Sequence, residues 1–142
     1  VAIIGAGNMG SGIAQKTAQE EFDVQMVDRE AQWVERGQTI IADFLSEAVE
    51  RRIFSPQQVA DIQGRITGVI GTENTSPDTD LVIEAVFEDF DIKTAVFNTL
   101  NEVCGDKTIL ASNTSSLSVN DLSAASGRPD RFVGLHFFYH PI

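Results

Sequence analysis

Short apolar runs alternate along this chain with longer segments whose apolar residues recur at helical spacing. The strand-like runs are residues 1–4, 22–28, 65–70, 81–86, 108–111 and 131–136. Helical spacing or helix-start signals mark residues 30–49, 55–62, 89–103 and 119–125. Strands separated by helical crossovers predict an α/β fold with a doubly wound, mostly parallel sheet of about six strands. A helical pair is expected between the second and third strands.

A glycine-rich turn joins the first strand to the first helix, with the sequence Gly5-Ala6-Gly7-Asn8-Met9-Gly10. In this pattern Gly5 permits the tight turn, Gly7 lets the backbone approach a phosphate, and Gly10 lets helix and strand pack closely. The helix that follows directs unpaired N–H groups and the positive end of its dipole at the same place. The turn therefore predicts a dinucleotide-binding Rossmann domain whose pyrophosphate lies on these residues.

The second predicted strand ends in an acidic residue, Asp28, eighteen positions beyond Gly10. A carboxylate at this place accepts hydrogen bonds from the hydroxyls of the adenosine ribose and repels a 2′-phosphate. Without the glycine motif, Asp28 would be read as an ordinary polar strand end. With that motif before it, Asp28 predicts a site that takes NAD rather than NADP.

The composition fits a single domain and narrows the range of partners. The 142 residues are 42% hydrophobic, and they contain no run of 18 apolar residues that could span a membrane. The net charge of −11 argues against nucleic acid and against an anionic membrane surface, because both require clustered Lys and Arg. The single cysteine, Cys104, excludes an internal disulfide and a cysteine-based metal site, and we expect no metal. The same cysteine usage indicates a reducing location, which we expect to be cytoplasmic.

Polar side chains follow several predicted strands, which is where ligands of open α/β sheets bind. Residues 112–116 read Ser-Asn-Thr-Ser-Ser, and a helix cap needs only one of these hydroxyls, so the surplus favours ligand binding over capping alone. His136 ends the last strand and is either a structural histidine beside aromatic residues or a general base. Glu88 precedes a predicted helix, where an acidic residue also stabilises the helix start. Glu88 and Lys93 are five residues apart, which is not the spacing of an ordinary helical ion pair.

Four segments together resemble the nucleotide-binding domain of the L-3-hydroxyacyl-CoA dehydrogenase family, which includes 3-hydroxybutyryl-CoA dehydrogenases. They are residues 5–14, 83–88 (Ile-Glu-Ala-Val-Phe-Glu), 112–117 (Ser-Asn-Thr-Ser-Ser-Leu) and 134–138 (Gly-Leu-His-Phe-Phe). The resemblance covers nearly all of the chain. It implies NAD-dependent oxidation of an L-3-hydroxyacyl-CoA to the 3-ketoacyl-CoA, and the reverse reaction, as in fatty-acid β-oxidation.

The resemblance also implies roles for individual residues. His136 would take the proton of the 3-hydroxyl while C3 gives hydride to NAD, and Ser115 would hydrogen-bond the substrate oxygen near the nicotinamide. Glu88 and Lys93 match positions that contact the cofactor. The family also uses basic residues of the helical pair for the CoA phosphates, and Arg51 and Arg52 lie in that region.

The chain departs from the family pattern at its end. Tyr139 stands where the family has an asparagine on the cofactor side. The glutamate that orients the family's histidine lies roughly a dozen residues beyond it, past Ile142, as does the helical domain that completes the acyl site and forms a homodimer. We therefore expect residues 1–142 to be an NAD-binding domain truncated at both ends, which binds NAD(H) weakly and turns over poorly by itself.

Two other functions fit the same residues. One is a dehydrogenase of the same fold that acts on a sugar acid, which a panel of substrates with and without CoA would distinguish. The other is a non-catalytic NAD-binding module, for which Tyr139 is the only hint in the sequence. Such a module would bind NAD without reducing a 3-ketoacyl-CoA.

Overall fold

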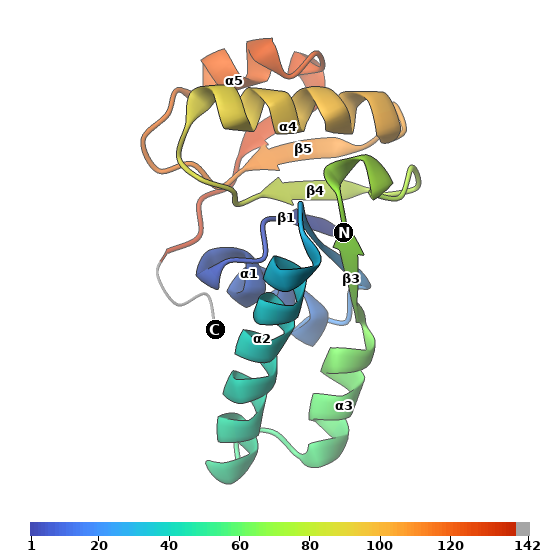
Figure 1. Ribbon diagram of the computed structural model, residues 1–142, viewed down its shortest axis with the longest axis vertical. Coiled ribbons are helices and arrows are strands. Elements are labelled where there is room, and N and C mark those ends of the chain that lie inside the picture. Colours follow the sequence, from blue (N-terminus) through green and yellow to red (C-terminus); the bar gives the residue numbers. More distant parts are fainter. Residues whose placement is uncertain (139–142) are drawn as a thin grey trace.

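A computed structural model describes residues 1–138 as a parallel six-stranded sheet with helices on both faces (Figure 1). The strands lie in the order β3-β2-β1-β4-β5-β6. Their bounds are β1 Ala2–Ile4, β2 Val24–Asp28, β3 Ile66–Ile70, β4 Leu81–Glu84, β5 Ile109–Ser112 and β6 Phe132–Gly134. The predicted doubly wound Rossmann sheet is confirmed, and its strand order reverses between β1 and β4, where such sheets bind their ligands.

Five α-helices and two short 3₁₀ turns connect the described strands. They are α1 Asn8–Gln19, α2 Ala31–Glu50, α3 Pro56–Gly64, η1 Thr72–Asn74, α4 Phe90–Val103, α5 Val119–Ala125 and η2 Pro129–Arg131. The helical pair predicted after the second strand is confirmed as α2 and α3, which project together beyond the sheet (Figure 1). Ser55 and Gln58 form a reciprocal capping box ahead of Pro56, which explains why α3 begins there.

The sheet separates two hydrophobic cores because successive strand residues point to opposite faces. In β1, Ile3 packs with α1, α2 and α3, whereas its neighbours Ala2 and Ile4 pack with α4 and α5. Ile83 and Val82 of β4 divide between the two cores in the same way. This double burial holds the carboxyl edge of the central strands in a fixed geometry.

Two strands end earlier than the apolar runs predict. β4 ends at Glu84, whose side-chain oxygen accepts a hydrogen bond from Val86 N at 2.8 Å, so the chain leaves the ladder there. β6 ends at Gly134, which places His136 two residues beyond the strand and not within it. The predicted departure at Tyr139 lies outside the described residues. No helix within residues 1–138 has the length and apolar character needed to cross a membrane.

Candidate active site

The glycine-rich turn after β1 is shaped by the packing of the chain itself at two of its three glycines. Gly5 has φ +107°, and a Cβ there would come within 2.6 Å of the carbonyl oxygen of Ala85. A Cβ on Gly10 would lie 1.7 Å from the carbonyl oxygen of Gly5. Any side chain at either position would therefore collide with backbone.

Gly7 is different, because neither its backbone angles nor its packing within the chain requires a glycine. Its φ of −72° suits any residue, and a Cβ would meet nothing within 4 Å. Gly7 caps α1, which has no side-chain cap and no acidic residue in its first turn, whereas Ser55, Asp89 and Ser118 cap α3, α4 and α5. An open space before an uncapped helix N-terminus fits an anion such as the pyrophosphate of NAD.

Asp28, at the end of β2, is fixed beside this turn. Its Oδ2 accepts a hydrogen bond from Ala6 N at 2.8 Å, and its Oδ1 accepts one from Arg29 N at 2.8 Å. A carboxylate has about four acceptor positions, so both oxygens keep capacity for further donors. The structure therefore brings Asp28 to the glycine turn in a way that fits binding of ribose hydroxyls.

Replacing Gly7 with alanine is expected to weaken NADH binding by about tenfold or more, because the methyl group would occupy the space nearest the phosphates. The free energy of unfolding should change by less than about 0.5 kcal/mol, since the backbone angles suit alanine and the space is open. Fluorescence titration with NADH and urea unfolding would measure the two effects. Gly64→Ala is a matched control, because a Cβ on Gly64 also meets nothing within 4 Å. Equal NADH affinity in both variants would contradict the prediction.

A buried charge cluster joins β4, β5 and α4 at the same edge of the sheet. Glu84 and Lys93 are 0% and 1% exposed, and their Oε1 and Nζ atoms lie 2.5 Å apart. The other oxygen of Glu84 accepts a hydrogen bond from Ser112 Oγ at 2.6 Å. The Lys93 ammonium also lies 3.2 Å from Oε2 of Glu88 and donates to the carbonyl oxygen of Val86 at 3.3 Å.

Glu88 holds the serine-rich loop. Its Oε1 accepts hydrogen bonds from Thr114 Oγ1, from Ser115 N at 3.1 Å, and from the N and Oγ of Ser116 at 3.2 and 3.0 Å. Burial alone would raise the pKa of Glu88, but the hydrogen bonds from Thr114 and Lys93 and the charge of Lys93 lower it from 4.5 to about 2. Glu88 is therefore ionised throughout the neutral range and fixes the backbone of Ser115.

Glu88→Gln is expected to destabilise the chain in a pH-dependent way. Because the pKa of Glu88 is lower in the folded chain, its stabilising contribution is complete above about pH 4.5 and is lost as the pH falls toward 2. The side chain is 36% exposed, so solvent screening limits the loss at pH 7 to about 1 kcal/mol. Urea unfolding of both proteins between pH 7 and pH 2 would test this, and a difference that stays constant over that range would contradict it.

Ser115 and His136 are both exposed, and their segments are joined by hydrogen bonds. Leu135 N donates to the carbonyl oxygen of Ser112 at 2.9 Å, and Phe137 N donates to Asn113 Oδ1 at 2.7 Å. The His136 ring lies against the Phe138 ring, with centroids 4.9 Å apart. The structure thus brings the predicted serine loop and the predicted histidine to one edge of the sheet.

Arg51 and Arg52 follow the last turn of α2. Arg51 forms an ion pair with Glu47, and Arg52 takes a left-handed conformation with φ 58°. In the part of the chain that the structure describes, no hydrogen bond or ion pair links them to the residues at the carboxyl edge. Arg51 instead borders a groove of about 300 Å³, whose other lining residues are Gln15, Gln19, Phe44, Glu47, Ala48, Ile53 and Phe54.

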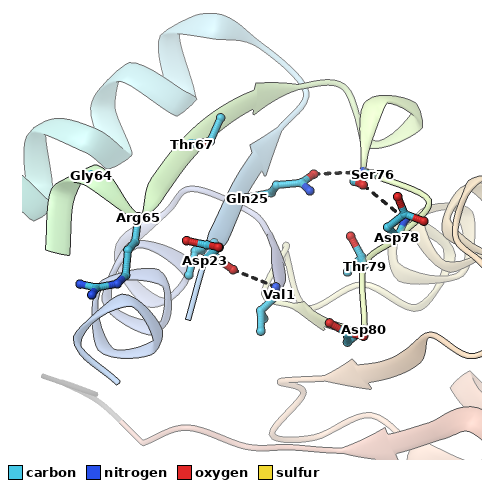
Figure 2. A pocket seen from close by; sticks show the side chains of 11 residues that line it. Val1, Asp23, Gln25, Gly64, Arg65, Thr67, Ser76, Asp78, Thr79 and Asp80 are labelled. Atoms are coloured by element: carbon cyan, nitrogen blue, oxygen red, sulfur yellow. Dashed lines mark hydrogen bonds between the residues drawn. The ribbon is translucent and has the colours of Figure 1, made fainter. Parts of the chain in front are cut away.

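A second groove, of about 350 Å³, lies at the opposite edge of the sheet, where the strands begin (Figure 2). Asp23, Asp78 and Asp80 line it, and Arg65 is the one basic side chain among the lining residues within 1–138. Three carboxylates repel phosphate groups, and the switch-point rule places ligands at the other edge. This groove is therefore a poor site for a dinucleotide, and none of the predicted site residues lines it.

Two parts of the cluster were not predicted as site residues. In the sequence, Glu84 belongs to the family-like segment 83–88 and Ser112 to the serine-rich loop, whereas the structure buries both side chains completely. A signal for Glu84 exists in the sequence, because a charge within the apolar run 81–86 needs a buried partner. Lys93 is predicted to contact the cofactor, and in the structure its ammonium is engaged by two carboxylates.

The glycine turn at the switch point and Asp28 at the end of β2 are features of a dinucleotide-binding domain. The segments that carry Ser115 and His136 meet at the same carboxyl edge of its sheet. The family model described as "3-hydroxyacyl-CoA dehydrogenase, NAD binding domain" matches residues 1–142. The chain therefore belongs to the NAD-binding domain family of 3-hydroxyacyl-CoA dehydrogenases, and the predicted family and cofactor are confirmed.

Known relatives agree with this membership. The chain is 37% identical to a 3-hydroxybutyryl-CoA dehydrogenase of Clostridioides difficile over 97% of its own length and 49% of that protein. It is 40% identical to a probable 3-hydroxybutyryl-CoA dehydrogenase of Deinococcus radiodurans, over 95% and 48%. The crystal structure of (S)-3-hydroxybutyryl-CoA dehydrogenase from Ralstonia eutropha superimposes with a TM-score of 0.93 at 37% identity, over 99% of this chain and 49% of that one. The chain thus spans about half the length of these relatives.

Proposed function

We propose that the protein containing this chain oxidises L-3-hydroxyacyl-CoA to 3-ketoacyl-CoA with NAD, and catalyses the reverse reaction. The observation that carries the proposal is the joining of the Ser115 and His136 segments by two hydrogen bonds, at the edge of the sheet that carries the glycine turn. The names of the relatives support a 3-hydroxyacyl-CoA as the substrate. The chain covers about half the length of those relatives, so the activity belongs to the whole protein in this proposal.

The residues that would hold NAD are those of the glycine turn, with Asn8 and Met9 at the start of α1, together with Asp28 and Glu88. The open space at Gly7 fits this group, because an added Cβ would meet no protein atom there. When bound, NAD supplies the acceptor for hydride from the substrate carbon. Lys93 supports the cofactor side through Glu88, since its own side chain is 1% exposed.

His136 and Ser115 would act on the substrate oxygen. Both side chains are exposed at the carboxyl edge, so a substrate can reach them. The imidazole of His136 accepts the proton of the 3-hydroxyl during oxidation and returns it to the 3-keto oxygen during reduction. Ser115 hydrogen-bonds the same oxygen, and its backbone is held for this by Glu88.

Arg51 and Arg52 would bind the phosphates of CoA. Arg51 borders the groove at the end of α2, whose lining includes the apolar side chains of Phe44 and Phe54. Gln15 also lines this groove, and its buried Oε1 accepts no hydrogen bond within the described residues. The pantetheine arm of CoA carries amide N–H groups and methyl groups that suit such a surface. A cytoplasmic homodimer completes the proposal for the whole protein.

A panel of substrates with the full-length protein and NADH tests this function. We expect consumption of NADH with acetoacetyl-CoA and none with free acetoacetate or with keto sugar acids. Reduction of a keto sugar acid without CoA would support a sugar-acid dehydrogenase instead. NADH binding with no turnover on any 3-ketoacyl-CoA would support a non-catalytic module.

A further inference from the structure

We propose that Asn113 is a positioning residue for His136. Its Oδ1 accepts a hydrogen bond of 2.7 Å from Phe137 N, the amide that directly follows the histidine. On the other side of His136, Leu135 N donates to the carbonyl oxygen of Ser112 at 2.9 Å. Ser112 and Asn113 therefore hold the backbone immediately before and immediately after the proposed base.

The segment that carries His136 needs such support, because it lies beyond the last strand. β6 ends at Gly134, and residues 134–136 are exposed. Phe137 is half-buried and packs against the core that contains Ala6 and Ala111. That packing places the Phe137 side chain, whereas the bond to Asn113 fixes the orientation of the peptide that joins it to His136.

Asn113 is itself anchored to the buried cluster. Its N–H donates to the carbonyl oxygen of Glu84 at 2.8 Å, and the preceding Ser112 Oγ donates to Glu84 Oε2 at 2.6 Å. Glu84 is fully buried and paired with Lys93. The hydrogen bond to Phe137 thus connects an exposed segment to the loop that is anchored on the buried Glu84–Lys93 pair.

The consequence for catalysis rests on the proposed function. A general base must lie within hydrogen-bond reach of the proton that it takes, and a misplacement of about 1 Å can cost about 100-fold in rate. Ser115 lies two residues beyond Asn113 in the same loop, so one asparagine sets the loop that carries the serine against the segment that carries the histidine. Asn113 does not touch the reacting atoms in this role.

The test compares Asn113→Ala, which removes the acceptor, with Asn113→Asp, which retains an oxygen of the same reach. In the 142-residue chain, we expect amide hydrogen exchange of Phe137 to accelerate by about tenfold or more in the alanine variant and to stay slow in the aspartate variant. In the full-length protein, kcat for acetoacetyl-CoA should fall by about 10- to 100-fold in the alanine variant and recover substantially in the aspartate variant. The Kd for NADH should not change.

Asn98→Ala, on the exposed face of α4, is the matched control and should change none of these values. If Asn113→Ala does not fold, Asn113→Ser replaces it, because the shorter side chain cannot reach Phe137 N. Unchanged Phe137 exchange, or unchanged kcat, in the variant without the acceptor would overturn the proposal. A full-length wild-type protein that reduces no 3-ketoacyl-CoA would instead overturn the proposed function, and Phe137 exchange would still decide whether Asn113 positions the segment.

Discussion

Replacing Lys93 with methionine is expected to lower the free energy of unfolding of the chain by about 3–5 kcal/mol, because it leaves a buried carboxylate without its partner. Glu84 is 0% exposed, and the Lys93 ammonium is the cation that faces it at 2.5 Å. Solvent cannot compensate a charge at this depth. This is the largest effect on stability that we expect from a single change at the site.

Urea unfolding of the wild type and three variants would measure this effect. Adding Glu84→Gln to Lys93→Met should restore much of the lost stability, since a glutamine removes the charge and can still accept from Val86 N. Lys16→Met is the control, because Lys16 and Glu20 form an exposed ion pair worth less than about 1 kcal/mol. A loss below about 1 kcal/mol in Lys93→Met would show that the buried pair does not carry the stability assigned to it here.

Replacing His136 with glutamine in the full-length protein is expected to lower kcat by about 10²- to 10⁴-fold, the range typical of a lost general base. Glutamine can hydrogen-bond the substrate oxygen but cannot take its proton. The Kd for NADH should stay within about twofold, because His136 lies beyond β6 and outside the glycine turn.

Steady-state reduction of acetoacetyl-CoA and a separate NADH titration would measure the two values. A parallel fall in NADH affinity would mean that His136 serves the cofactor site and not the proton transfer. An unchanged kcat would remove His136 from the mechanism.

Most of the fold could be predicted because its signals are local. Ser55-Pro56 marks the start of α3 through capping, and the predicted bounds 119–125 agree with those of α5. The ends of β4 and β6 were predicted two residues too late. An apolar run does not reveal where a side chain, such as that of Glu84, takes over the backbone hydrogen bonds.

The candidate site likewise contains residues that the sequence predicts and contacts that it does not predict. Gly5, Gly10 and Asp28 could be predicted, because the turn between a strand and a helix imposes its own spacing. The bond between Asn113 and Phe137 could not, since it joins two loops 24 residues apart and depends on how β5 and β6 lie side by side. The burial of Lys93 likewise depends on where α4 crosses the sheet, which the sequence pattern does not specify.

Titration of the 142-residue chain with NADH and with NADPH is the most direct measurement of the site described here. We expect saturable binding of NADH and binding of NADPH weaker by about tenfold or more, because Asp28 repels the 2′-phosphate. Gly7→Ala should weaken NADH binding in the same assay. Failure to bind NADH, or equal affinity for both nucleotides, would contradict an NAD site formed by the glycine turn and Asp28.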